Sequence, residues 1–556
     1  MTATSFTAVV SGDTTVTARG PVRDAAERML GRLWIDQVPV RLASEDPALW
    51  PSAGAAAGDG RTLCWPGQPG PSRALLPRVG ELRATADAEG LTEVALLGRG
   101  APARAARLIA RNSAAGRPLT LLDSAEPGPV ARLGADRDRL DRTMVVVTGD
   151  DTATETLRQI LVRMFQDLDL SPAQIARRFV TVAEPGSASA KRANEAGHPL
   201  IEAPGRTPFG ALSPYALVPA ALAGTDVARL LDHAATVLPA LTRPENNPGL
   251  VLGAILGGAA RAGRPTVVLG DYPASLPGLA DWVAVLLAEA TGGRMLPLVQ
   301  HGGLPVLPSD DVFLVTLDGR PRQDDATVTA PPSVQLVVWE YAAAVAAQLL
   351  GGDPLAPPPG AATPDPHAEP DPHAQPDPHA TAPDVPAEES AASTVLIVGD
   401  PGQAVEVHTH DPVLGRATDL TGLFDALAER VGADGHLAIV AHLDPDRARG
   451  QGTQVRRLGA LLAARCARPV TISWGSRYPA IGNDRRERGV YLVLTGNVVH
   501  DVPVPGRHYR LSRLQLARAL AEARAARTGG RPVVRLHLQN RWAGLARLLE
   551  SARGEA

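Results

Sequence analysis

The stretch VVVTGDDTATET, residues 145–156, joins an apolar run to a short polar turn and to the start of an amphipathic segment. A buried strand followed by a tight turn and a helix presents backbone N–H groups that bind anions such as phosphate. This turn, however, carries Asp150 and Asp151. Each carboxylate, if about 4–6 Å from a phosphate dianion, would repel it by about 1 kcal/mol or more, whereas a helix terminus attracts it by only ~0.3–1 kcal/mol. The turn is therefore expected to bind phosphate poorly.

The same turn has a structural interpretation. Thr152 and Glu155 have the T-x-x-E spacing of a capping box, and acidic residues favour the first turn of a helix. We favour this helix-cap interpretation over an anion site.

Apolar runs alternate with amphipathic segments along the chain, which is the pattern of a layered α/β fold with mainly parallel sheets flanked by helices. Continuous apolar strands of this kind suit burial on both faces of a sheet. The strands are expected at 93–98, 119–123, 144–149, 179–183, 265–270, 311–317, 394–399, 436–443, 469–475, 490–496 and 533–538.

Composition limits the class of protein. A chain of 556 residues exceeds the size at which one core stops growing, so at least two domains are expected. A net charge of -4 gives no reason to expect nucleic acid or an anionic membrane as a partner. We find no signal peptide and no window of about 18 uninterrupted apolar residues, so a cytoplasmic protein is expected. Cys64 and Cys466 stand far apart with no metal-type spacing, and both are expected to be reduced.

Residues 356–393 interrupt the α/β pattern with three copies of PDPHA. So much proline blocks helices and removes backbone donors, which favours an extended linker or inserted loop. His367, His373 and His379 would otherwise form a weak metal-binding tract. We favour a solvated repeat and expect no function in it.

Longer motifs follow one another in order along the chain. They are AEPGSASAKRANEAG (183–197), ALSPYALVPAALAGTDVARLL (211–231), NPGLVLGAILGGAARAGRPTVVLGDY (247–272), DWVAVLLAEATGG (281–293) and WEYAAAVAAQLLGGDPLAPP (339–358), then WGSRY, GVYLVLTG, DVPVPGRHYRLSRLQLARALAEA and RPVVRLHL. Together these stretches resemble the glucose-6-phosphate isomerase family, in the bacterial branch that also occurs fused to transaldolase. The resemblance runs collinearly over roughly residues 25–550 apart from the linker.

The resemblance implies two sugar-isomerase (SIS) domains, each a mainly parallel sheet flanked by helices. The implied organisation is an N-terminal helical segment (1–75), a first SIS domain (76–245), and a second SIS domain with C-terminal elements (246–355 and 394–550), with the proline-rich linker at 356–393. The family is usually dimeric and interconverts glucose 6-phosphate and fructose 6-phosphate without a metal or organic cofactor.

The resemblance also implies a mechanism. After the sugar ring opens, a glutamate carries a proton between C1 and C2 through an enediol, a role that suits a carboxylate within hydrogen-bond reach. Glu289, in LLAEATGGR, falls on the glutamate of the family's ESTGK signature. It is therefore the candidate catalytic base, the alternative being an ordinary carboxylate at a helix end.

Other positions depart from the family pattern. The glycine-rich turn GMGGSSLAPE becomes GRGAPARAAR (98–107), which keeps Gly98 and Gly100, loses both serines and adds Arg99 and Arg104. These arginines would either contact an anion or lie on a solvated helix face, and we favour the second interpretation. The phosphate turn SKSGTTxET becomes TGDDTATET, in which Thr148, Thr152 and Thr154 remain as candidate substrate ligands.

Three further family residues are altered. Pro208 stands where the family has the arginine that stabilises the enediolate, and Arg206 lies two residues earlier as a possible replacement. Ala480 stands where the ring-opening histidine belongs. The family's lysine segment dissolves into the linker, and Lys191, the only lysine, lies in a different motif.

Two functions are consistent with this pattern of retained packing segments and altered site segments. One is an aldose–ketose isomerase with a rebuilt site that uses Glu289. The other is a non-catalytic SIS protein that binds a sugar or sugar-phosphate ligand, or a partner isomerase, as a regulatory or scaffold subunit. A homodimer or a pair with an active paralogue is expected, with no metal and no cofactor.

Overall fold

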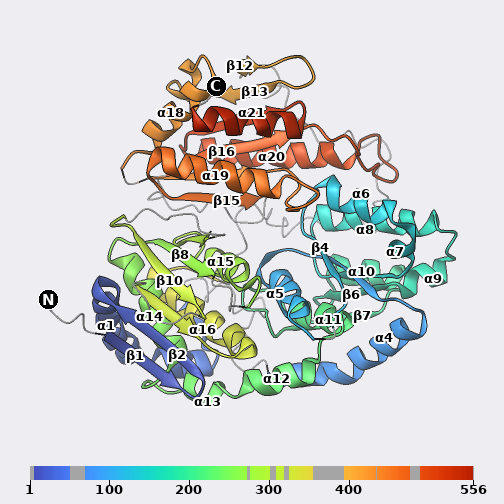
Figure 1. Cartoon of the computed structure of the whole chain (residues 1–556). Coiled ribbons are helices and arrows are strands. Elements are labelled where there is room, and N and C mark those ends of the chain that lie inside the picture. The colour runs from blue at the N-terminus through green and yellow to red at the C-terminus, as the bar shows by residue number, and fades with distance from the viewer. Residues whose placement is uncertain are drawn as a thin grey trace, which may run out of the picture. The chain divides into compact units, whose positions relative to one another are not determined.

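The computed structural model describes residues 6–50, 69–114, 116–271, 276–300, 309–318, 325–354, 394–433, 435–475 and 489–554 (Figure 1). The chain forms two compact units. The first comprises residues 1–123, 138–155 and 165–356, and the second comprises 124–137, 156–164 and 357–556. Helices α7 (Arg137–Asp141) and α8 (Thr152–Gln166) cross the limits of these ranges.

The first unit contains a five-stranded parallel sheet in the order β4-β3-β5-β6-β7. Its strands are β3 (Glu93–Leu97), β4 (Leu119–Leu122), β5 (Thr143–Val147), β6 (Phe179–Ala183) and β7 (Leu200–Glu202). The helices near it in the chain are α4 (Leu76–Ala88), α5 (Gly100–Arg111), α9 (Pro172–Arg177) and α10 (Ala188–Glu195), and the segment α11 (Pro214–Leu222), α12 (Val227–Ala235) and α13 (Leu238–Leu241) follows.

The first unit also contains a six-stranded mixed sheet in the order β1-β2-β11-β10-β8-β9. Its strands are β1 (Phe6–Ser11), β2 (Thr14–Arg19), β8 (Thr266–Asp271), β9 (Leu296–Gln300), β10 (Val312–Leu317) and β11 (Ala326–Thr329). Strands β8 to β11 pair in parallel, and the β1–β2 hairpin joins them antiparallel. The helices of this part are α1 (Gly20–Ile35), α2 (Val38–Ala43), α14 (Pro248–Arg261), α15 (Leu279–Ala290) and α16 (Pro332–Leu350).

The hairpin corrects the expectation that residues 1–75 are helical. Threonine and valine dominate β2, and such β-branched residues favour strands over helices. Ser11 pairs with Thr14, so a two-residue Gly-Asp loop closes the hairpin, with Gly12 at φ +57. The helices α1 and α2 follow only after this hairpin.

The second unit contains a six-stranded sheet in the order β12-β13-β17-β16-β14-β15. Its strands are β12 (Thr394–Val398), β13 (Val405–Thr409), β14 (His436–Ala441), β15 (Val470–Trp474), β16 (Gly489–Gly496) and β17 (Val533–Leu538). Strands β14 to β17 pair in parallel, whereas β12 and β13 are antiparallel. The helices are α6 (Pro127–Ala135), α18 (Leu420–Val431), α19 (Gly452–Cys466), α20 (Leu511–Thr528) and α21 (Arg541–Arg553).

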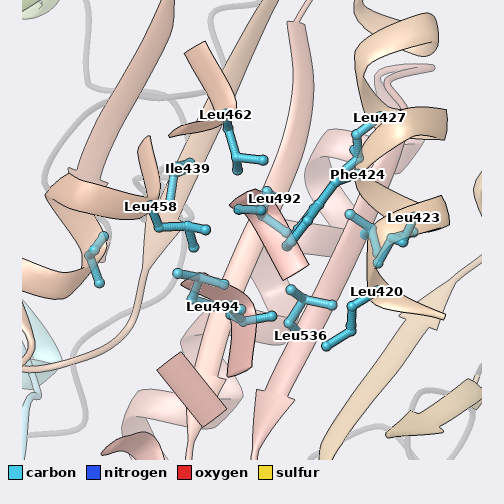
Figure 2. Close-up of a cluster of buried hydrophobic side chains, with 14 of the residues drawn as sticks. Leu420, Leu423, Phe424, Leu427, Ile439, Leu458, Leu462, Leu492, Leu494 and Leu536 are labelled. Atoms are coloured by element: carbon cyan, nitrogen blue, oxygen red, sulfur yellow. The ribbon is translucent and has the colours of Figure 1, made fainter. Parts of the chain in front are cut away.

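The core of the second unit is rich in leucine, with Phe424 among the leucines of α18. Figure 2 shows Phe424 and its neighbours on α18 facing Leu492 of β16 and Leu536 of β17, with Leu458 of α19 close by. Val534, Leu536 and Leu538, which alternate along β17, belong to this core, as expected for a strand with one face against a helix layer, here α21.

The α/β class with mainly parallel sheets flanked by helices is confirmed. The structure adds that residues 246–355 and 394–550, which we assigned together to a second SIS domain, each contribute strands to a sheet of their own. The apolar runs located strands in both segments, but such runs carry no information on which strands share a sheet.

Helix α16 is the single described helix long and apolar enough to cross a membrane by length and composition. The 18-residue stretch of α16 that meets this criterion is 83% buried inside the protein, mostly against α14 and neighbouring helices. This burial is that of a core helix.

Glu340, on α16, is a buried carboxyl that is not among the predicted site residues. It is 2% exposed and its Oε1 accepts a hydrogen bond from the Ala211 N–H at 2.7 Å. Burial raises the pKa of Glu340 to about 8, and the Ala211 N–H only partly opposes this. Glu340 therefore fixes the segment that leads into α11 while it remains largely protonated at neutral pH.

We predict that Glu340 makes the protein less stable as the pH rises. The protonated form is favoured in the fold, so its stabilisation is complete below the ordinary pKa of 4.5 and is lost as the pH rises through about 8. Glu340→Gln keeps an oxygen for Ala211 and does not ionise. Toward alkaline pH the variant should unfold at a higher urea concentration than the wild type. Its free energy of unfolding should then be larger by several kcal/mol.

The control is Glu429→Gln, on an exposed position of α18. It should follow the wild type at every pH. Parallel pH profiles for wild type and Glu340→Gln would contradict the buried, protonated state.

Candidate functional site

The predicted site residues of the first unit meet at one edge of its parallel sheet. Strand β3 lies between β4 and β5, and the chain leaves β3 toward β4 but leaves β5 toward β6 on the other side. Open α/β sheets bind ligands outside the carboxyl ends of strands at such a switch point. The turns 98–100 and 148–151 follow these two strands, so the topology itself brings them together.

Glu289 reaches this edge from α15. Its Oε2 accepts a hydrogen bond from the Ala101 N–H at 3.0 Å, and Ala101 is in the first turn of α5. The side chain of Arg99, the residue before α5, makes no capping hydrogen bond to that helix, so the Glu289 carboxylate supplies an acceptor there. This contact joins residues that are 188 positions apart in the sequence.

Gly100 makes the contact possible. Its φ is +81, a conformation that side chains rarely adopt, and a Cβ there would lie 2.9 Å from Glu289 Oε1. Only glycine both turns the chain at this point and leaves room for the carboxylate. The retained Gly100 is thus tied directly to the candidate base.

The surroundings of Glu289 raise its pKa. Burial is the largest cause, and the Ala101 N–H and the charges of Arg206, Arg99 and Arg104 oppose it without cancelling it. A general base must take a proton from its substrate, and a raised pKa makes a carboxylate a stronger base. The geometry therefore suits the role that the sequence suggests for Glu289, which stays a prediction.

The three candidate arginines are each paired with an aspartate. Arg99 Nε lies 3.3 Å from Asp151 Oδ2, and Arg104 Nη2 donates to Asp123 Oδ2 at 2.7 Å, where Asp123 is 4% exposed on its side chain. Arg206 Nη1 donates to the Thr148 carbonyl at 3.3 Å, and its Nη2 lies 3.7 Å from Asp150 Oδ1. The structure thus places Arg206 beside the site, but engages all three guanidinium groups within the chain.

The cap of α8 differs from the capping box that the sequence suggested. The helix begins at Thr152, and Asp151 precedes it. Asp151 Oδ1 accepts hydrogen bonds from the N–H groups of Ala153 at 2.9 Å and Thr154 at 3.3 Å. A capping box requires its threonine before the helix, so the Thr152–Glu155 assignment is wrong by one residue, and the Glu155 carboxylate lies 3.2 Å from Arg192 Nε.

The threonine candidates differ in position. Thr148 is 6% exposed, and its hydroxyl donates to the Leu97 carbonyl at 3.3 Å. The buried Thr154 donates its hydroxyl to Asp151 Oδ2 at 2.9 Å. Thr152 is exposed in the first turn of α8. The hydroxyls of Thr148 and Thr154 are therefore both bonded within the protein, to β3 and to Asp151.

The remaining expectations fall elsewhere. Lys191 lies on α10. Ala480 and the PDPHA histidines lie outside the described residues. Within the described part of the chain, no group of three or more His, Cys, Asp or Glu side chains could hold a metal ion.

Comparison with curated proteins gives relatives of one kind. The probable glucose-6-phosphate isomerase of Halobacterium salinarum is 34% identical over 175 residues, which are 31% of this chain and 41% of that protein. The glucose-6-phosphate isomerase of a Synechococcus strain is 29% identical over 227 residues, which are 38% of this chain and 42% of that protein. Over these segments the chain is similar to glucose-6-phosphate isomerases.

The relationship to this family is partial in extent. The matches span about two fifths of the length of the curated relatives, less than the collinear similarity that the motifs suggested. No protein-family profile matches the sequence. The activity of the whole protein is therefore a matter of proposal.

Solved structures show only distant likeness. A hypothetical protein of Thermus thermophilus covers 96% of this chain and 91% of its own, at 15% identity and a TM-score of 0.41. A glucose-6-phosphate isomerase of Chlamydia trachomatis covers 62% of this chain and 86% of its own, at 14% identity and a TM-score of 0.46. Likeness at these scores is too weak to support a functional argument.

We predict that Gly98→Ala destabilises the protein by about 1–3 kcal/mol, because the added methyl group would overlap the Thr148 hydroxyl. The second change Thr148→Ala should recover part of this loss, since the Cβ of Thr148 is 3.4 Å from the added methyl and can remain. Urea unfolding of the single and double variants measures this coupling.

Gly80→Ala is the matched control. Gly80 is exposed on α4, with nothing near an added Cβ, so this change should be neutral or stabilising. Equal losses in the Gly98→Ala and double variants would show that Thr148 is not the obstacle.

Proposed function

We propose that the chain interconverts an aldose and a ketose, the reaction class of its named relatives, with Glu289 as the group that carries the proton. The observation that carries the proposal is the Glu289 carboxylate, held 3.0 Å from the Ala101 N–H at the switch point of a parallel sheet, with its pKa raised. The sheet edge supplies the place for a ligand and the carboxyl supplies the chemistry.

In the proposed reaction the open-chain aldose lies against Glu289. The carboxylate takes the proton from C2, which leaves an enediolate with its charge on O1. The proton of the C2 hydroxyl moves to O1 as the C2 carbonyl forms. Glu289 then returns its proton to C1, which gives the ketose and restores the carboxylate. Of the three arginines, Arg206 has the charge that most lowers the pKa of Glu289. We therefore assign to its guanidinium the role of stabilising the enediolate.

A non-catalytic protein is the second candidate, and the pairing of the arginines favours it. Each of the three arginines, Arg99, Arg104 and Arg206, has an aspartate partner. A substrate anion would therefore have to compete with an aspartate for each guanidinium. Such a protein would bind a sugar or sugar-phosphate ligand, or an active paralogue, as a regulatory subunit. In either case we place the protein in the cytoplasm, as a homodimer or paired with that paralogue.

Comparison of wild type with Glu289→Gln tests the isomerase. A coupled assay with fructose 6-phosphate and with fructose measures turnover. Since an amide cannot carry the proton, the variant should lose at least about 100-fold in kcat, with little change in KM. Glu195→Gln, on the exposed face of α10, is the control and should keep full turnover.

Two results would contradict the proposal. The first is turnover that survives Glu289→Gln, which would reject Glu289 as the group that carries the proton. The second is no wild-type turnover with either sugar while a sugar still raises the thermal midpoint, which would establish the non-catalytic binding protein.

A further inference from the structure

The Asp151 carboxylate takes up the donors that a phosphate group would use at this sheet edge. It accepts from the N–H groups of Ala153 and Thr154 and from the Thr154 hydroxyl, and it faces Arg99 Nε at 3.3 Å. Free N–H groups at a helix N-terminus, a hydroxyl and a guanidinium are together the means by which proteins bind phosphate. Here one side chain of the protein holds all four.

The same donors also hold the turn together. A phosphate entering the turn would have to displace the Asp151 carboxylate from three hydrogen bonds. The displaced carboxylate would stay next to the phosphate, because Asp151 is part of the turn that follows β5. Charge-assisted hydrogen bonds of this kind are among the stronger ones, and like charges at a few ångström repel. Exclusion of phosphate therefore follows from occupation as well as from repulsion.

The charges around Glu289 support this independently. Three guanidinium groups, those of Arg99, Arg104 and Arg206, face the three carboxylates of Asp151, Asp123 and Asp150. Glu289 adds a further carboxyl, so the arginines leave no positive excess for a substrate dianion. A neutral sugar meets no such penalty.

We infer that the Asp151 carboxylate occupies the place that the phosphate group of a sugar phosphate would take in this site. The site therefore selects an unphosphorylated aldose or ketose. The inference rests on the proposed function, since it names the sugar that the Glu289 site takes. Asp151 is a specificity-determining residue in this account: it fills the subsite by its own bonds and carries no proton for the reaction.

Calorimetric titration of inorganic phosphate tests the occupation directly. Asp151→Ser frees the N–H groups at the start of α8 and Arg99, so this variant should bind phosphate at least about tenfold more tightly than the wild type, which is the effect of ~1.4 kcal/mol. Asp226→Ser is the matched control, because Asp226 caps α12 by accepting from Arg229 N–H at 3.0 Å but pairs with none of the site arginines. It should bind phosphate no better than the wild type.

Asp151→Asn provides a second variant in case the serine variant does not fold. It keeps a side-chain oxygen as acceptor for α8 but removes the charge, and it should also gain phosphate affinity, by less than the serine variant. Saturable phosphate binding by the wild type that equals the variants would overturn the inference, as would folded variants that gain nothing.

Titration of the wild type with fructose and with fructose 6-phosphate separates this inference from the proposed function. Fructose should bind at least as tightly as its phosphate ester. Tenfold preference for the ester would overturn the inference and leave the isomerase standing. Binding of fructose without turnover would reject the isomerase and leave the role of Asp151 standing.

Discussion

The hydrogen bond from the Ala101 N–H to the Glu289 carboxylate is the contact on which the site depends. It connects the helix after β3 to the end of α15, so it fixes the candidate base against the sheet edge. Gly100 is a condition of this contact, because its positive φ turns the chain and its missing side chain leaves space. The same enclosure that holds the carboxylate raises its pKa.

The aspartate–arginine pairs decide what else this edge can hold. A phosphate-binding turn relies on backbone N–H groups and cations that stay available until a ligand arrives. In this protein Asp151 occupies the start of α8, and Arg99 and Arg206 face Asp151 and Asp150. The turn keeps the strand-to-helix connection that the fold requires, but its donors are no longer available to an anion. Retained fold and altered ligand chemistry are thus compatible in one short segment.

The local sequence pattern predicted the helices and strands, whereas the geometry of the site depends on contacts between residues far apart in the sequence. The apolar run at 436–443 contains β14, and the run at 144–149 covers β5 except its first residue, because buried parallel strands need continuous apolar sequence. The cap was misplaced by one residue, since Asp151 and Thr152 are both good capping residues and only the backbone decides between them. The Ala101–Glu289 contact and the arginine pairs join segments far apart in the chain, so no spacing could reveal them.

Solvent proton exchange measures the central claim most directly, because it reports on Glu289 whether or not net turnover is fast. Fructose is incubated with the protein in D2O, and deuterium at the carbon next to the carbonyl is followed by NMR. The account predicts incorporation that depends on wild-type protein and is absent with Glu289→Gln. No incorporation into fructose or fructose 6-phosphate, by a protein that binds either sugar, would contradict proton transfer at this carboxylate.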